Sequence, residues 1–218
     1  MPPSGRGPHQ SLERPRLTSG HFIGFSISMA SSRYDQRKNL EEAEANAIGT
    51  EMLRADLLPP ADAANVRSLL GAYLDQRILF YINQDAARQT QIDLSTSQLQ
   101  AALWDAVRGP ATAQPTPVTW LVLAGMNDVI NSQGYTQAAF WNRLPDGVWW
   151  LMVAIAVCPN VLFGFRSRDG KAARKLAFVL PFVVAIAFLL IADIDTPRRG
   201  LIHVRPQNLE ALAKSFGR

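Results

Sequence analysis

Two long apolar segments near the C-terminus limit what this chain can fold into. The first covers residues 147–165 and the second covers residues 176–192, and neither contains a charged side chain. An α-helix rises about 1.5 Å per residue, so these segments would be about 28 and 25 Å long, against roughly 30 Å of bilayer hydrocarbon. Helices of this length in soluble domains normally carry a polar stripe. The pattern therefore predicts a transmembrane hairpin and disfavours the alternative, two buried helices of a soluble core.

Charged residues at the ends of these segments divide the chain into parts. A basic loop, residues 166–175, lies between the two predicted spans. Residues 31–146 form a predicted helical extramembrane domain, and residues 193–218 form a C-terminal tail. Residues 1–21 are rich in Pro, Gly, Ser and Arg and have no apolar period, which is typical of a disordered tail.

A short apolar stretch follows the predicted tail. Residues 22–30 are apolar but contain two serines, and they are too few to cross a bilayer as a helix. We interpret them as the remnant of a transmembrane helix whose first half is missing.

Apolar residues in the middle of the chain recur at intervals of three and four, the period of an amphipathic helix. The pattern predicts helices over residues 39–58, 66–82, 95–109 and 118–131. Pro59 and Pro60 end the first helix and can open the second. The spacing of Ser95 and Gln98 fits a capping box for the third, which Gly109-Pro110 would end. No strand-like alternation is visible, so the predicted fold class is all-α.

Acidic residues lie opposite the apolar face of the first of these helices. The apolar positions include Leu40, Ile48 and Met52, whereas the opposite face carries four glutamates. We interpret that face as solvated, with these acidic residues: Glu41, Glu42, Glu44 and Glu51.

Composition argues against several classes of function. The net charge is +4, but the basic residues cluster beside the apolar segments, where anionic lipid headgroups explain them better than nucleic acid does. Cys158 is the only cysteine, and the three histidines have no metal-ligand spacing. No phosphate-binding loop, zinc-binding helix or nucleophile elbow is present. We therefore expect no enzymatic activity, no cofactor and no metal, and we expect the lipid bilayer as a partner.

Several short motifs carry a family resemblance. They are Gly24–Ala30, Arg33-Tyr34-Asp35-Gln36-Arg37, Glu44–Thr50, Leu53–Pro59 and Ile191–Gly200. In combination they resemble the bacterial bestrophin-like domain of unknown function, over roughly residues 22 to 213. Members of that family look like four-span proteins with two helices before the Glu-Ala-Asn-Ala-Ile motif. The resemblance therefore implies that this chain is truncated at its N-terminus.

The family resemblance also implies a function. True bestrophins are oligomeric chloride channels, so the resemblance implies a homo-oligomeric subunit of an anion channel or transport assembly in the bacterial inner membrane. The alternative is a non-conducting membrane scaffold or interaction protein with a helical extramembrane domain.

Ten positions in the motifs and predicted spans are candidate functional residues. Glu44 and Asn46 could form a site just outside the membrane, although a solvated helix face is the favoured interpretation. Asp193 and Asp195 could bind a cation or pair with nearby arginines. The favoured interpretation is that they end the apolar helix at the edge of the membrane. Pro159-Asn160 could kink its helix and line a pathway. The favoured interpretation is a kink that serves only the packing against neighbouring helices. The candidates are Arg33, Tyr34, Asp35, Glu44, Asn46, Asn160, Asp193, Asp195, Pro197 and Arg198, and the arginines considered as partners are Arg198 and Arg199.

Overall fold

The structure is a computed structural model that describes residues 16–166, 171–198 and 200–217. This part of the chain contains helices and no strand, which confirms the all-α fold class. The elements are α1 (Arg16–Arg54), the 3-10 turn η1 (Ala55–Leu57), α2 (Pro60–Ile82), α3 (Ala86–Ala113), α4 (Pro117–Trp141), α5 (Asp146–Arg166), α6 (Lys171–Asp195) and α7 (Gln207–Ser215).

The chain forms two compact units. One contains the start of α1 up to Met29 together with residues 145–191, which include α5 and most of α6. The other contains residues 30–144 and 192–218. We call this second unit the helical domain. α1 contributes to both units, because the stretch interpreted as a span remnant, residues 22–30, continues into the rest of α1 as one helix.

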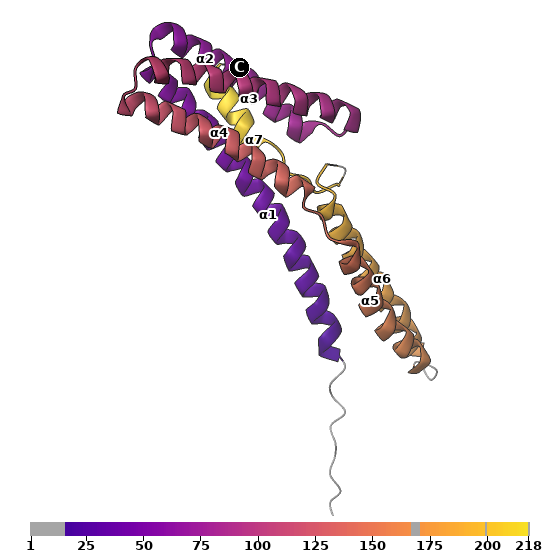
Figure 1. Ribbon diagram of the computed structural model, residues 1–218. Coiled ribbons are helices and arrows are strands. Elements are labelled where there is room, and N and C mark those ends of the chain that lie inside the picture. The colour runs from indigo at the N-terminus through magenta and orange to yellow at the C-terminus, as the bar shows by residue number, and fades with distance from the viewer. Residues whose placement is uncertain (1–15, 167–170, 199, 218) are drawn as a thin grey trace, which may run out of the picture. The chain divides into compact units, whose positions relative to one another are not determined.

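An apolar core holds the helical domain together. α2 packs against α3, α3 packs against α4, and the short α7 packs against α2, as Figure 1 shows. The fully buried apolar residues come from every helix of the domain, so its stability rests on burial between helices more than on any single helix. They include Ile48, Val66, Leu70, Tyr73, Leu74, Phe80, Leu103, Met126, Val129 and Leu209.

Several predicted helix ends were wrong. α1 ends at Arg54 and is followed by η1, whereas the prediction continued the helix to residue 58. α3 begins at Ala86, because the Asp85 side chain accepts a hydrogen bond from the Ala87 N–H at 3.0 Å and so caps the helix. The predicted cap, Ser95, lies inside α3.

The predicted C-terminal ends of α3 and α4 were also wrong, because they were placed at a proline and at polar residues. Pro110 lies inside α3, which continues to Ala113, so the proline does not end the helix. α4 runs to Trp141, ten residues beyond the predicted end at Asn131, because its buried stripe continues through Ser132, Thr136 and Phe140. Pro60 opens α2, as predicted.

The two apolar segments lie within α5 and α6. Among the residues that the structure describes, no helix has both the length and the hydropathy needed to cross a membrane. The basic loop between the segments falls partly on residues 167–170, and most of the predicted tail falls on residues 1–15. Both of these stretches lie outside the described residues.

The cap of α4 gives a test of this fold. Thr116 and Thr119 form a capping box in which each side chain bonds the other residue's backbone N–H, at 3.2 and 3.0 Å. Thr116→Ala should lower the free energy of unfolding by about 1 kcal/mol, because the Thr119 N–H loses the hydroxyl that accepts its hydrogen bond. Thr112→Ala is the control: its exposed hydroxyl bonds only carbonyls of its own helix. Thermal unfolding followed by circular dichroism measures both variants, and equal melting temperatures would contradict the assigned cap.

Candidate functional site

Nine of the ten predicted candidate residues lie in the helical domain, and six of these lie in or beside its polar networks. α1 contributes Arg33 and Glu44, and the end of α6 with the segment after it contributes the other four. Most of these side chains are buried or half-buried and make specific polar contacts. The four are Asp193, Asp195, Pro197 and Arg198.

Asp195 joins the end of α6 to α1 and to the end of α4. Its carboxylate forms an ion pair with Arg33 at 3.2 Å and accepts the backbone N–H of Leu144 at 3.0 and 3.2 Å. The side chain is buried. Asp195 is therefore paired with Arg33, whereas Arg199, one of the partners considered for it, lies outside the described residues.

Arg37, one turn along α1 from Arg33, makes a second connection to the same elements. Its Nε donates to the carbonyl of Ala139 at 3.2 Å, and its Nη1 donates to the carbonyl of Ile194 at 2.8 Å. The side chain is 3% exposed. Burial lowers the pKa of Arg37, and the nearby Asp195 carboxylate only partly offsets this effect.

Asp193 shapes the segment that follows α6. Its carboxylate accepts the backbone N–H groups of Leu201 and Ile202, at 2.6 and 2.8 Å. The turn also brings Gly200 so close that an added Cβ would lie 2.4 Å from the Asp193 carbonyl oxygen. Asp193 therefore holds a turn, and among the described residues no group of three or more acidic, His or Cys side chains is placed to hold a metal.

Glu44 lies at the centre of a second buried network. Arg77 on α2 donates to both carboxylate oxygens of Glu44, through Nε and, at 3.3 Å, through Nη2. Tyr81 and Thr136 donate to Oε2 at 3.3 and 3.2 Å. Burial opposes the charge on Arg77, but the Glu44 carboxylate outweighs it and raises the pKa of Arg77. The same burial and carboxylate raise the pKa of Tyr81.

The interpretation of the glutamates as a solvated face was wrong for three of the four. Glu41, Glu44 and Glu51 are at most 1% exposed, and only Glu42 is exposed. The physical reason for Glu41 and Glu44 is that each carboxylate accepts hydrogen bonds from specific partners. Glu41 accepts the backbone N–H groups of Asn208 and Leu209 at 2.9 and 3.0 Å, at the positive N-terminal end of α7.

Glu51 is buried without such partners. Neither carboxylate oxygen has a hydrogen-bond partner in the described structure, and the nearest cation, Arg54, lies 3.8 Å away. Glycine at position 125 makes room for it, since an added Cβ would lie 1.9 Å from Glu51 Oε2. Burial raises the pKa of Glu51 to about 8, Arg54 lowers it in part, and Asp128 raises it further. Glu51 is therefore largely protonated at neutral pH.

Arg198 lies against an aromatic cluster formed by Phe80, Tyr81 and Phe140. The ring centroids of Phe80 and Phe140 are 5.0 Å apart, and the Arg198 guanidinium carbon lies 4.7 and 5.5 Å from them. Burial lowers the pKa of Arg198; nearby Asp93 raises it, and Arg143 and Arg77 lower it. Contacts of this kind stabilise a cation by about 0.5–2 kcal/mol each.

The remaining candidates do not join these networks. Tyr34 is half-buried against the apolar core, whereas Asp35 and Asn46 are exposed. Exposure of Asn46 agrees with the favoured interpretation of a solvated face at that position. Asn160 lies in α5, in the other unit, and its side chain is outside the described part of the structure.

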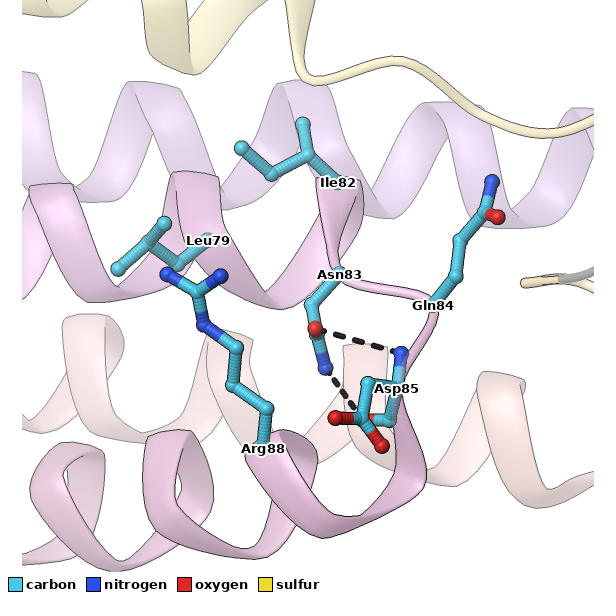
Figure 2. Close-up of a pocket in the computed structure, with 6 residues that line it drawn as sticks. All are labelled: Leu79, Ile82, Asn83, Gln84, Asp85 and Arg88. Carbon is cyan, nitrogen blue, oxygen red and sulfur yellow. Dashed lines mark hydrogen bonds between the residues drawn. The ribbon is translucent and has the colours of Figure 1, made fainter.

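A pocket of about 380 Å³ lies at the turn between α2 and α3 (Figure 2). Two of its polar residues bond each other: Asn83 Nδ2 donates to the Asp85 carbonyl at 2.7 Å, and the Asp85 N–H donates to Asn83 Oδ1 at 3.3 Å. These contacts hold the turn that leads into α3, next to its cap at Asp85. The other lining residues are Leu79, Ile82, Gln84 and Arg88, and nothing in this set points to a reaction.

Comparison with known proteins identifies the family. The bestrophin-like domain matches residues 17–209, almost the whole described chain. This chain belongs to the bestrophin-like domain family. No curated protein sequence matches it.

Solved structures share the bestrophin-like fold. A variant of a bacterial bestrophin homolog from Klebsiella pneumoniae superimposes with a TM-score of 0.71 at 12% identity, covering 91% of this chain and 82% of that one. A second variant of that homolog gives 0.70 at 13% identity, covering 91% and 82%. A crystal structure described only as a membrane protein variant gives 0.69 at 14% identity, covering 91% and 81%. At these identities the likeness concerns the fold alone.

The sequence analysis of this bestrophin-like chain missed Arg77, Glu41, Glu51 and the two phenylalanines. One signal was available: Arg77 interrupts an otherwise apolar stripe of α2 between Leu74 and Phe80. A single arginine on a buried face requires a buried acceptor. The sequence could therefore have indicated an ion pair, but it could not have identified Glu44 as the partner.

The buried ion pair gives a prediction about stability. Arg77→Met should lower the free energy of unfolding by about 3–5 kcal/mol, because Glu44 stays buried without its cation. Adding Glu44→Gln should restore part of that loss, since the double variant buries no charge. Arg67→Met is the control on the same helix: Arg67 and Asp56 form an exposed pair, so less than about 1 kcal/mol should be lost. Thermal or denaturant unfolding measures all three, and equal losses at positions 67 and 77 would contradict the structure.

Glu51 gives a prediction about pH. Its pKa is about 8 in the folded state, against an ordinary value of 4.5, so between these values the folded chain holds a proton that the unfolded chain releases. Stability should therefore fall as pH rises from about 5 to 8, and Glu51→Gln should flatten that fall. Glu42→Gln, at an exposed position of the same helix, should leave it unchanged. Melting temperatures across the pH range measure the slopes, and parallel curves for Glu51→Gln and the unaltered protein would refute the assignment.

Proposed function

We propose that this chain is a subunit of a homo-oligomeric assembly that conducts anions across the bacterial inner membrane. The observation that carries the proposal is the family match over residues 17–209. The apolar segments at residues 147–165 and 176–192 would form a transmembrane hairpin in the lipid bilayer, because each is long enough to cross it as a helix. Residues 31–146 would then form an extramembrane domain. The motifs of this chain favour the bacterial branch of the family whose function is unknown.

The relatives support this proposal only in part. The solved structures are described as a bacterial bestrophin homolog and as a membrane protein, and they share the fold. Conduction by this chain therefore rests on family membership, which is an argument from analogy.

A non-conducting membrane scaffold is the second candidate. The observation in its favour is that neither apolar segment contains a charged side chain. A pore for anions normally offers cationic groups or backbone donors at its constriction. A conducting assembly would have to supply those donors from polar side chains such as Asn160, from kinked backbone or from other parts of the oligomer.

Flux through reconstituted vesicles tests the two candidates. The full chain, first shown to stay in membranes through an alkaline carbonate wash, should give chloride, nitrate or bicarbonate flux that Asn160→Leu changes by at least about threefold. Asn160 carries the only side-chain amide in either apolar segment. Cys158→Ala, a neutral change in the same segment, is the control and should leave flux unaltered.

The outcomes separate the candidates clearly. Absence of flux from a protein that is inserted and cross-links as an oligomer would reject the channel in favour of the scaffold. Release of the chain by carbonate alone would reject the transmembrane hairpin itself.

A further inference from the structure

Three arginines converge on the aromatic cluster of the helical domain. The guanidinium carbon of Arg77 lies 4.3 Å from the Phe80 ring centroid, that of Arg198 lies 4.7 Å from it, and that of Arg37 lies 5.9 Å from the Phe140 centroid. They come from α2, from the segment after α6 and from α1, and so from parts of the chain far apart in sequence. The fold therefore places three cations around two touching rings.

Positive charge is in excess around these rings. Glu44 neutralises Arg77, and Asp195 pairs with Arg33. Arg37 is held by backbone carbonyls, which carry no net charge. Asp93 on α3 acts on Arg198 from a distance, but Arg143 and Arg77 oppose it. An uncompensated cation in a poorly hydrated site is costly unless an anion accompanies it.

Arg198 offers an anion the better geometry. Its Nε and Nη2 are both buried and have no hydrogen-bond partner among the residues that the structure describes. These two nitrogens form one edge of the guanidinium, and their N–H bonds point in parallel. Such an edge matches the two oxygens of a carboxylate-like group, which accept two parallel hydrogen bonds. Arg37 Nη2 and Arg77 Nη1 are further buried donors without a partner in the described structure.

We propose that the Nε–Nη2 edge of Arg198, beside Phe80 and Phe140, binds a small planar oxyanion of the formate, nitrate or bicarbonate type. A two-oxygen anion satisfies both donors at once, whereas chloride offers a single centre to a forked edge. The edge is shielded from solvent, so a free small anion fits the site better than a carboxylate on another protein. Arg198 belongs to the segment between α6 and α7, so no helix has to change for an anion to bind its guanidinium edge.

The proposal concerns binding and stands whether or not the protein conducts ions. The test uses the full chain in detergent, titrated with sodium formate, nitrate or chloride at constant ionic strength, and follows the melting temperature by tryptophan fluorescence. Formate and nitrate should each raise the melting temperature by about 2–5 °C and saturate, because the anion binds only the folded state. Chloride should give less than a fifth of that rise at equal concentration.

Three variants make the test specific. Arg198→Lys keeps the charge but removes the forked edge, so the oxyanion-dependent rise should disappear. Arg88→Lys, at an exposed arginine of the same domain, should keep it. Asp93→Asn removes the carboxylate that acts on Arg198 while keeping an oxygen to accept the bond from Gln89, so oxyanion affinity should increase about threefold.

Each outcome decides the proposal. An equal rise with chloride, the absence of any rise, or an unchanged rise in Arg198→Lys would overturn it. If Arg198→Lys does not fold, Asp93→Asn still decides, because unchanged affinity in that variant would overturn the role of Arg198.

Discussion

The buried ion pair between Glu44 and Arg77 is the contact on which the helical domain depends. Both side chains are fully buried, and they connect α1 to α2. Removing two such charges from water costs several kcal/mol each, and only good geometry with further hydrogen bonds can offset that cost. Tyr81 and Thr136 provide those bonds, and Thr136 brings in α4. Three helices therefore have to be in place together before this one carboxylate is satisfied.

The other glutamates of α1 follow the same logic with different partners. Glu41 accepts the N-terminal N–H groups of α7, so a helix at the end of the chain is held by a residue near its beginning. Glu51 instead faces Gly125 of α4 and keeps its proton near neutral pH. One helix thus presents a charged carboxylate in an ion pair, a helix cap and a carboxyl group that is largely neutral. Environment decides which form each residue takes.

The sequence predicted the class of fold but not these contacts. The all-α class followed from periodicity, since the apolar positions of α1 to α4 repeat at helical spacing. The glutamates were misplaced because periodicity assigns a charged residue to solvent by default. Their partners could not be seen locally: Arg77 lies 33 residues from Glu44, and Asn208 lies 167 residues from Glu41.

The misplaced helix ends have a similar cause. A spacing such as Ser95 to Gln98 is common inside helices, and only the competing cap at Asp85 shows which residue starts α3. The family motifs contain Arg33, Glu44, Asp193 and Asp195, which lie in the polar networks of the domain, and Arg198, which lies against its aromatic cluster. The sequence could not identify their partners, because α1 and the end of α6 are far apart along the chain and come together only in the folded structure.

The arrangement of α1 also explains why charge is retained where apolar residues could pack. Replacing a buried ion pair by well-packed apolar residues is often neutral or stabilising, so stability alone does not account for Glu44 and Arg77. The apolar residues on the same stripe, Ala45, Ile48 and Met52, would still make contact if α1 shifted along its axis by one turn. Glu44 would not, since a shift of about 5.4 Å breaks its bonds to Arg77 and leaves two buried charges unpaired. The ion pair therefore contributes less to the free energy of unfolding than to the uniqueness of the folded state, because it makes every other register of α1 costly.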